Sequence, residues 1–265
     1  MGFFSGAIYS EVLGMDTTIG AIIPHDSRYH RGVSDPVEGV VIREKPRTLI
    51  LLHGLSDNWA VWGYRTRILS YAEQYDIAVI MPEVQRSFYQ DMENGEAYFT
   101  YITEELPKLV SRLFNISTEP EDLMIAGLSM GGYGALRCGL ANPDRYRAIG
   151  AFSSATDLEG FVFNMPDRKE TNGYRPTMRG IFGEVMKLRD EANLYRLCDK
   201  ASAAGAKLPF MMTCGTEDEL YQDNVDFYEY MAKKGMNVTF DKWAGIHEWG
   251  FWDVSIQMFL ERYVR

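Results

Sequence analysis

Six short runs of apolar residues, separated by longer stretches with helical periodicity, constrain the fold of this 265-residue chain more than any other feature. The runs are Thr48–Leu52, Ile77–Met81, Leu123–Leu128, Ala148–Ser153, Phe210–Cys214 and Val238–Trp243. Continuous apolar strands of this length are buried on both faces, as in a parallel sheet that helices cover on each side. The helices are expected at Trp59–Gln74, Glu96–Phe114, Met130–Ala141, Tyr221–Lys234 and Gly250–Tyr263. The sequence therefore predicts an α/β fold with a mainly parallel central sheet.

The N-terminal part of the chain adds antiparallel strands to this pattern. Ile8–Leu13 and Thr17–Ile23 alternate apolar and polar residues on either side of Gly14–Asp16, which predicts a β-hairpin. Another short strand is predicted at Gly39–Arg43, before the first buried run. We expect the hairpin to extend one edge of the sheet, and the helices to cover both of its faces.

One long interval, about 155–207, carries no clear strand. It is too long for a simple loop inside a compact domain. We therefore predict a cap-like insertion with its own short helices, placed over the carboxyl ends of the strands, where ligands bind in such sheets. Because the alternation of strand and helix resumes after this interval, residues 1–265 are expected to form a single domain.

Composition and charge narrow the class of function. The net charge of −10 and the lack of any Lys/Arg run argue against nucleic acid and anionic membranes as partners. No apolar run approaches the roughly 20 residues of a membrane span, and the first residues do not form a secretory signal. The three cysteines lack CxxC spacing and no His/Asp/Glu cluster has ligand spacing, so neither a disulfide nor a metal site is predicted. These features predict a soluble, cytoplasmic protein with reduced thiols.

A serine between glycines stands where the third buried run ends and a helix is expected to begin. Gly127-Leu128-Ser129-Met130-Gly131 matches the pattern G-x-S-x-G. A serine on such a sharp strand-to-helix turn takes a strained backbone conformation and presents its hydroxyl above the sheet, and only very small neighbours fit around it. We predict that Ser129 is a nucleophile. A structural serine in a tight turn is the simpler alternative.

A serine nucleophile needs a base that accepts its proton, and histidine is the usual base. Of the four histidines, His53 follows the first buried run and His247 stands between the last run and the last helix, so both lie at the carboxyl edge of the sheet. In folds with this serine turn the chain order is serine, acid, histidine. His247 is therefore the predicted base, and His53 is assigned a structural role. His25 and His30 are expected at the surface.

The carboxylate that orients the histidine should follow a strand between the serine and His247. Glu217, Asp218 and Glu219 come directly after the run Phe210–Cys214. Asp218 is the predicted acid. Glu217 is the main competitor, because a shift of one residue at a strand end reverses the side to which a side chain points. Glu219 suits the N-terminus of the following helix, where negative charge is favourable.

An acyl-transfer site also needs N–H donors for the oxyanion that develops in the transition state. One predicted donor is the backbone N–H of Met130, and the other is that of Leu55, in the loop after the first buried run. Gly54 is explained by a tight turn in the same loop. We predict that apolar residues of the insertion line the acyl pocket. Packing inside the core of the insertion is an equally good interpretation of the same residues. This lining is Phe161, Phe163, Met165 and Phe182.

Five stretches carry a resemblance to a known family. They are "LLHGLSDNWAVW", "YITEELPKL", "AGLSMGGYGAL", "CGTEDELY" and "GIHEWGFWD". Together they resemble the esterase D and tributyrin esterase branch of the α/β-hydrolases, which is related to the S-formylglutathione hydrolases and to the feruloyl and acetylxylan esterases. The resemblance implies the α/β-hydrolase fold and ester hydrolysis without a cofactor. The site residues that it implies are Ser129 as nucleophile, Asp218 as acid, His247 as base, and Leu55 and Met130 as oxyanion donors.

The expected function is that of a serine carboxylesterase that hydrolyses short-chain acyl esters, with acetyl and aromatic acyl groups as candidates. An S-formylglutathione hydrolase-type thioesterase would use the same residues and is the alternative. A binding protein that has lost catalysis on a hydrolase scaffold is a further, less favoured interpretation. The expected partner is a small-molecule ester. A homo-oligomer is expected only because relatives of this kind often self-associate.

Overall fold

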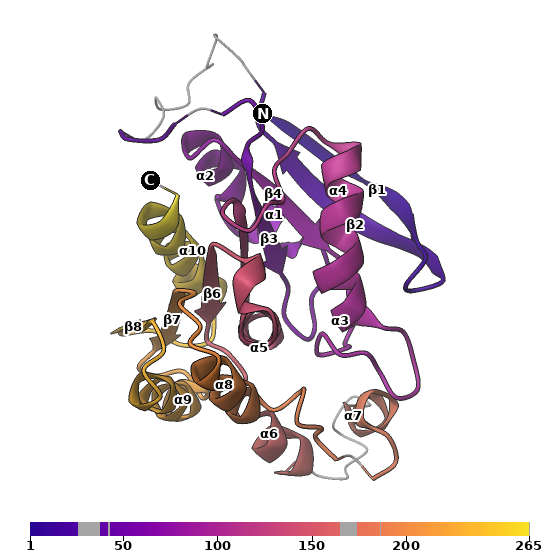
Figure 1. Cartoon of the computed structure of the whole chain (residues 1–265), viewed down its shortest axis with the longest axis vertical. Helices are drawn as coiled ribbons and strands as arrows, with labels where there is room; N and C mark the ends of the chain where they lie inside the picture. Colours follow the sequence, from indigo (N-terminus) through magenta and orange to yellow (C-terminus); the bar gives the residue numbers. More distant parts are fainter. Residues whose placement is uncertain (26–37, 42, 165–173, 186, 265) are drawn as a thin grey trace.

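A central β-sheet organises the computed structural model, which describes residues 1–25, 38–41, 43–164, 174–185 and 187–264 (Figure 1). Its strands lie in the order β1-β2-β4-β3-β5-β6-β7-β8. Their bounds are β1 (Gly2–Ser10), β2 (Met15–Ile23), β3 (Arg47–Leu52), β4 (Ile77–Pro82), β5 (Leu123–Leu128), β6 (Ala148–Phe152), β7 (Phe210–Gly215) and β8 (Val238–Trp243). The strands from β3 to β8 are parallel, whereas β1 and β2 are antiparallel. The predicted mainly parallel sheet with an N-terminal antiparallel hairpin is confirmed.

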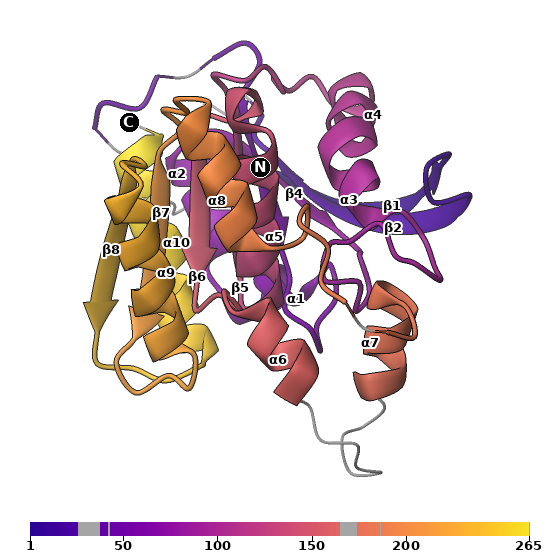
Figure 2. The same cartoon turned by 60° about the horizontal axis from the view of Figure 1, so that its bottom comes forward.

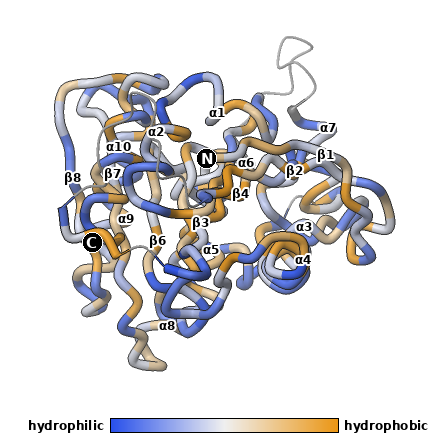
Figure 3. The backbone as a smooth tube through the Cα atoms, turned by 90° about the horizontal axis from the view of Figure 1, so that it is seen from above, coloured by the Kyte–Doolittle hydropathy of each residue, from blue (hydrophilic) through white to orange (hydrophobic). Residues whose placement is uncertain are grey.

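Helices cover both faces of this sheet (Figure 2). On one face the buried cluster includes side chains of α4 (Leu106–Leu113), α5 (Met130–Ala141), α8 (Leu194–Ala203) and α9 (Tyr221–Lys233). On the other face it includes α1 (Val61–Arg65), α2 (Ile68–Gln74) and α10 (Trp249–Tyr263). Side chains of β3 point alternately to the two faces of the sheet. Ile50 and Leu52 belong to the first cluster, and Leu49 and Leu51 belong to the second. Figure 3 shows β3 and β4 as strongly apolar segments in the middle of the molecule.

The N-terminal hairpin forms, but its first strand and its turn differ from the prediction. The strand predicted at Ile8–Leu13 instead runs over Gly2–Ser10, and residues 11–14 form the turn. The reason is local: the hydroxyl of Ser10 accepts a hydrogen bond from Leu13 N–H at 3.0 Å and donates one to the carboxylate of Glu105. This pairing turns the chain away from the strand direction, and Gly14 at φ 66° completes the turn.

The strand predicted at Gly39–Arg43 is wrong at the positions that the structure describes. Residues 39–41 and 43 belong to no strand, and position 42 lies outside the described residues. Gly39 has a φ of 90°, which breaks an extended conformation. Arg43 instead donates its backbone N–H to Asp76 and pairs its guanidinium with Asp122. The backbone of this segment is therefore held by side chains and not by a ladder of strand hydrogen bonds.

Two of the predicted helices are divided. Trp59–Gln74 splits into α1 and α2 because Thr66 between them is extended and accepts Ile68 N–H on its own hydroxyl. Glu96–Phe114 becomes α3 (Tyr98–Thr100), a π-helical turn (Tyr101–Glu105) and α4.

Pro107, the second residue after the π-helical turn, has no N–H to donate to the carbonyl of Thr103. That carbonyl accepts a hydrogen bond from Arg145 Nη1 at 2.7 Å instead. Arg145 also pairs with Glu104 at 2.5 Å. The side chain of Arg145 therefore supports the helix at the point where proline interrupts its hydrogen bonding.

The interval predicted as a cap-like insertion, about 155–207, contains helices of two kinds. Its helices are α6 (Leu158–Asn164), α7 (Tyr174–Phe182) and α8. Helix α8 packs against α5 and α9, so it belongs to the helical layer on the sheet. Figure 2 shows α6 and α7 beyond the ends of the strands toward which β5 and β6 point. Among the described residues, no helix is both long and apolar enough to span a bilayer.

Candidate active site

Ser129 occupies the sharp turn between β5 and α5. Its backbone has φ 53° and ψ −115°, a conformation that costs a residue with a side chain about 1–3 kcal/mol. Neighbouring segments hold it there: Ser129 N–H donates to the carbonyl of Phe152 at 2.8 Å, and the carbonyl of Ser129 accepts Tyr133 N–H at 3.0 Å and Ala155 N–H at 3.3 Å. The surrounding structure therefore imposes the strained turn, as an exposed nucleophile requires.

Close backbone approach explains the glycines of the motif. A Cβ on Gly131 would lie 2.5 Å from the carbonyl oxygen of Leu52 and 2.8 Å from that of His53. A Cβ on Gly127 would lie 2.6 Å from the backbone of Gly131. These contacts are with backbone atoms, which cannot rotate away. The start of α5 can therefore lie against the end of β3 only because both positions lack a side chain.

Asp218 and His247 meet at the carboxyl edge of the sheet, after β7 and β8 respectively. His247 Nδ1 lies 2.9 Å from Asp218 Oδ2 and 3.2 Å from Oδ1. The Asp218 side chain is fully buried, whereas 27% of the His247 side chain is exposed. Burial opposes ionisation of Asp218, but the hydrogen bonds from His247 and from Leu220 N–H outweigh it and lower the pKa of this carboxyl. The pair therefore holds an ionised acid against an imidazole that solvent can reach.

Glu217 and Glu219 take other positions. Both are exposed. Glu217 accepts Gly245 N–H at 2.5 Å and the hydroxyl of Thr216 at 3.0 Å, and these bonds lower the pKa of its carboxyl. Glu217 thereby ties the loop after β7 to the loop after β8. The geometry favours Asp218 over Glu217 as the partner of His247.

Ser153 and Trp252 border this pair and were not predicted as site residues. Ser153 is buried, has a φ of 44°, and accepts the indole N–H of Trp252 at 3.1 Å. Its hydroxyl also helps to lower the pKa of Asp218. The Trp252 ring stands edge-on to the ring of His247, with 4.8 Å between centroids and 85° between planes. The position of Ser153 directly after β6 is a signal that could have identified it, whereas Trp252 lies within α10 and offers no such signal.

These contacts link the turn that carries Ser129 to the Asp218–His247 pair. Ser129 N–H binds the carbonyl of Phe152, and the next residue, Ser153, contacts both Asp218 and Trp252. Within the described part of the chain, the hydroxyl of Ser129 is not hydrogen-bonded to His247. Bonds of this kind are often long before substrate binds and tighten in the complex.

The loop after β3 lies beside the serine turn. His53 is fully buried: its Nδ1 is 2.8 Å from the carbonyl of Gly54, and its Nε2 accepts Val84 N–H at 3.3 Å. These bonds match the structural role predicted for His53. Asp57 N–H donates to Gly54 at 3.2 Å and closes a turn that contains Leu55.

Met130 is the first residue of α5, and the first N–H groups of a helix have no partner within it. Neither the Met130 N–H nor the Leu55 N–H is paired with another described residue. Both backbone N–H groups are therefore free to bind an incoming oxygen.

The two predicted acyl-pocket residues whose side chains the structure describes, Phe161 and Phe182, take different positions. Phe182 is only 9% exposed and belongs to a buried core cluster. Phe161 packs against Phe88, with 5.7 Å between ring centroids, and lines a cavity of about 280 Å³. The side chain of Phe163 and the whole of Met165 lie outside the described residues. The position of Phe182 matches the alternative of packing inside the insertion.

The cysteines and the two N-terminal histidines are assigned no catalytic role, although Cys214 lies beside Asp218 and Ser153. Cys138, Cys198 and Cys214 are buried free thiols, and burial raises their pKa values to about 12, 11 and 12 respectively. His25 is exposed, and His30 lies outside the described residues. Among the residues that the structure describes, no group of three His, Cys, Asp or Glu side chains is arranged to hold a metal ion.

Comparisons with known proteins identify the family of the chain. Residues 42–262 match the family "Esterase", described as "Putative esterase". An acetyl esterase of Caldicellulosiruptor saccharolyticus is 33% identical over 251 residues, which are 94% of this chain and 92% of that protein. An S-formylglutathione hydrolase of Rattus norvegicus is 47% identical over 121 residues, which are 46% of this chain and 38% of the relative.

Solved structures extend the comparison to the whole fold. The fluorophosphonate-binding serine hydrolase FphF of Staphylococcus aureus superposes with a TM-score of 0.85 at 29% identity, covering 100% of this chain and 98% of the other. The S-formylglutathione hydrolase FrmB of the same organism has a TM-score of 0.82, also at 29% identity, with coverages of 100% and 99%. A ferulic acid esterase at 20% identity and a TM-score of 0.78 shares the fold. The chain therefore belongs to this esterase family, in its esterase D-like branch, and is a serine esterase with the α/β-hydrolase fold.

Proposed function

We propose that the protein is a carboxylesterase that hydrolyses short-chain acyl esters through Ser129, His247 and Asp218. The observation that carries this proposal is the 2.9 Å contact between His247 Nδ1 and the buried Asp218 carboxylate, beside a serine in a strained turn. The carboxylate accepts a hydrogen bond from Nδ1–H and leaves Nε2 free as the base. The imidazole is partly exposed, so a substrate can reach it.

The reaction would proceed in two stages. Ser129 Oγ attacks the ester carbonyl while His247 Nε2 takes the hydroxyl proton, and the ester bond then breaks as His247 returns that proton to the leaving alcohol. Water, deprotonated by His247, then attacks the acyl-enzyme, and the acid leaves as Ser129 regains its proton. Asp218 stabilises the imidazolium in both stages and is not itself protonated.

The oxyanion of each tetrahedral intermediate would be bound by two backbone N–H groups. The Met130 N–H opens α5, and the Leu55 N–H belongs to the turn that Asp57 closes. Such preorganised donors act on charge that exists only in the transition state, and loss of one costs about 10²–10³ in rate. Neither donor depends on a cofactor.

The acyl group is proposed to be small. The cavity of about 280 Å³ next to the site is bordered by Ala155, Phe161 and Leu220. The Ala155 N–H binds the backbone carbonyl of Ser129, which supports a position of this cavity near the proposed nucleophile. The acetyl esterase relative supports an acetyl group, and the ferulic acid esterase neighbour supports testing aromatic acyl groups as well.

A thioester substrate is the second candidate. Relatives named S-formylglutathione hydrolase match part of the chain, and a structure of that name matches all of it. Thioester hydrolysis would use the same serine, base and oxyanion donors, and only the recognition of the leaving group would differ. The homo-oligomer and the cytoplasmic location stay predictions, which sedimentation of the full chain and cell fractionation would test.

The test is a substrate panel on the wild-type protein and on Ser129→Ala. The panel contains nitrophenyl esters of increasing acyl length, methyl ferulate, an acetylated sugar and S-formylglutathione. We expect the highest kcat/KM for a short acyl group, and stoichiometric labelling of Ser129 by a fluorophosphonate probe. A higher kcat/KM for S-formylglutathione than for every ester would favour the thioesterase. Absence of labelling and of turnover would instead support a binding protein.

A further inference from the structure

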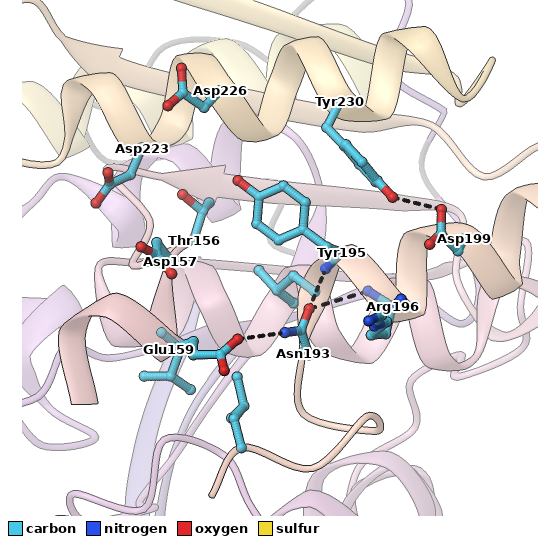
Figure 4. Close-up of a pocket in the computed structure, with 13 residues that line it drawn as sticks. Thr156, Asp157, Glu159, Asn193, Tyr195, Arg196, Asp199, Asp223, Asp226 and Tyr230 are labelled. Atoms are coloured by element: carbon cyan, nitrogen blue, oxygen red, sulfur yellow. Dashed lines mark hydrogen bonds between the residues drawn. The ribbon is translucent and has the colours of Figure 1, made fainter. Parts of the chain in front are cut away.

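A second cavity, of about 380 Å³, lies between the loop before α6 and helices α8 and α9 (Figure 4). One end of it is acidic. Asp157 comes from the loop, and Asp223 and Asp226 come from successive turns of α9. Tyr195 on α8 and Thr156 on the loop complete this end, which we call the acidic cavity. Figure 4 shows the hydroxyl end of Tyr195 turned toward the side on which Thr156 and the three carboxylates lie.

The three carboxylates have no cationic partner among the described residues. Asp157 accepts Gly160 N–H at 2.9 Å, and Asp226 accepts an amide N–H of Gln222 at 2.7 Å. The pKa of Asp223 is raised by burial and then by the negative charges of Asp157 and Asp226. Such mutual repulsion is a sign of like charges held together without a counter-ion.

The far end of the same cavity is different, because its charges are compensated. Asp199 there pairs with Lys234 at 2.5 Å and accepts the hydroxyl of Tyr230 at 2.7 Å. Arg196 also acts on Asp199 and lowers the pKa of that carboxyl, after the larger effects of Lys234 and Tyr230. Glu159 is a fourth carboxylate of the cavity without a cationic partner among the described residues, and it accepts an amide N–H of Asn193 at 3.4 Å.

Two hydroxyl groups face the charge of the acidic end and have no hydrogen-bond partner among the described residues. Thr156 is only 2% exposed, and its Oγ1 is buried without a hydrogen bond. An unsatisfied buried hydroxyl costs about 1–3 kcal/mol, so such groups usually have a partner. Burial raises the pKa of Tyr195 to about 12, with further contributions from Asp157, Asp226 and Asp223. The Tyr195 hydroxyl therefore keeps its proton at neutral pH and offers its oxygen as an acceptor.

The acidic cavity shares walls with a smaller cavity that borders neighbours of the proposed catalytic residues. The smaller cavity of about 280 Å³ shares Asp157 and Asp223 with it. The other walls of the smaller cavity include Ala155, whose N–H binds the carbonyl of Ser129, and Leu220, whose N–H binds Asp218 at 2.9 Å. A substrate at the serine could therefore extend through the smaller cavity to the three carboxylates.

We infer that the acidic cavity binds a protonated primary amine carried by the substrate, at some distance from the scissile carbonyl. The inference rests on the proposed function, because it assigns a substrate class to that same site. An ammonium group has three N–H donors and one positive charge. It matches a site that offers carboxylate and hydroxyl oxygens and lacks a counter-ion. A metal ion fits less well, since the described carboxylates are not grouped as metal ligands.

The test compares matched pairs of substrates. Each methyl ω-aminoalkanoate in a series of increasing chain length is paired with the methyl n-alkanoate of the same number of heavy atoms, because the smaller cavity that leads to the carboxylates is the proposed acyl pocket. The measured quantity is the ratio of the two kcat/KM values, which cancels any general loss of activity in a variant. We expect the ratio to reach about tenfold at one chain length, equivalent to about 1.4 kcal/mol. The ratio should fall as salt is added, because the carboxylates are partly exposed.

Two variants decide whether these residues are responsible. Asp157→Asn with Asp223→Asn keeps the volume and removes two charges, and should bring the ratio close to one. Asp144→Asn removes one charge from the turn Pro143–Arg145, which lines neither cavity, and should keep the wild-type ratio. A wild-type ratio near one at every chain length overturns the inference. So does a double variant that keeps the tenfold preference.

Failure of the proposed function would look different. If wild-type protein hydrolyses nitrophenyl acetate but shows no amine preference, only the inference fails. If it hydrolyses no ester, the proposed function fails, and binding of n-pentylamine measured by calorimetry then tests the cavity directly. Binding that is lost in the double variant but kept in Asp144→Asn supports the inference, and equal binding by all three proteins refutes it.

Discussion

Replacing Gly131 by alanine should remove most of the activity while leaving the protein folded. The added Cβ would lie 2.5 Å from the carbonyl oxygen of Leu52 and 2.8 Å from that of His53. Ordinary van der Waals contact begins at 3.4 Å, so the start of α5 has to retreat from β3 by about 0.9 Å. Met130 N–H moves with the helix, whereas Leu55 N–H stays with the loop after β3.

The size of the effect follows from this displacement. A misplacement of about 1 Å at a reacting centre can cost about 10² in rate, equivalent to about 2.7 kcal/mol in the barrier. Overpacking should lower the free energy of unfolding by about 1–3 kcal/mol. Part of this loss is recovered, because alanine is favoured over glycine inside a helix by about 1 kcal/mol. The expected outcome is thus a large fall in kcat with a modest fall in stability.

Gly139→Ala is the matched control on the same helix. Its Cβ would lie 2.5 Å from Ile149 Cγ1 and 2.7 Å from Ile149 Cδ1, which are side-chain atoms away from the serine turn. Both variants gain the same helix propensity and both introduce a clash, but only Gly131→Ala displaces an oxyanion donor. The assays are kcat for nitrophenyl acetate and urea unfolding. Equal kcat in the two variants would refute the reasoning.

Three further predictions follow from the site and its supports. Asp218→Asn should lower kcat by about 10⁴, since the amide cannot hold the Nδ1–H tautomer of His247, whereas Glu217→Gln should change it less than tenfold; steady-state kinetics checks both. Because the folded-state pKa of Asp218 is lowered, its ionisation stabilises the fold above the unfolded pKa of about 3.9. That contribution is lost as the pH falls through the folded-state value, so urea midpoints should fall more steeply below about pH 4 in wild type than in Asp218→Asn. Arg137→Met should lower the free energy of unfolding by about 2–5 kcal/mol, because it leaves the carbonyls of Glu191 and Tyr89 unpaired. Arg112→Met, at an exposed position, should change that free energy by less than about 0.5 kcal/mol. Urea unfolding of both variants measures the difference.

The parallel strands could be predicted from the sequence almost to the residue. Val238–Trp243 has the predicted bounds, but it is an edge strand of half-buried and exposed residues, so the predicted burial on both faces is wrong for it. Leu123–Leu128 also has the predicted bounds, and Ile77–Met81 extends only to Pro82. A strand buried on both faces must be apolar throughout, so its ends coincide with the ends of the apolar run. The strand β1 lacked such a signal, because Phe3 and Phe4 are 49% and 54% exposed on an edge. The apolar side chains of these two residues are therefore no sign that the strand is buried.

Some residues of the candidate site could likewise be predicted from the sequence, and others could not. Asp218 and His247 could be chosen because each directly follows a strand, and the parallel sheet brings such positions together. Trp252 reaches His247 from within α10, and the unpaired hydroxyl of Thr156 is defined by what surrounds it in space. Contacts of this kind depend on tertiary packing and leave no local pattern in the chain. The acyl pocket could not be predicted for the same reason, since Phe182 packs into the core.

The backbone of Ser129 at φ 53° has a consequence beyond catalysis. Glycine adopts this conformation without strain, so Ser129→Gly should raise the free energy of unfolding by up to about 3 kcal/mol. Selection for stability alone would therefore favour glycine at this position, and the protein would then lack its proposed nucleophile. The wild-type enzyme and a more stable variant without its proposed nucleophile would differ by one hydroxymethyl group.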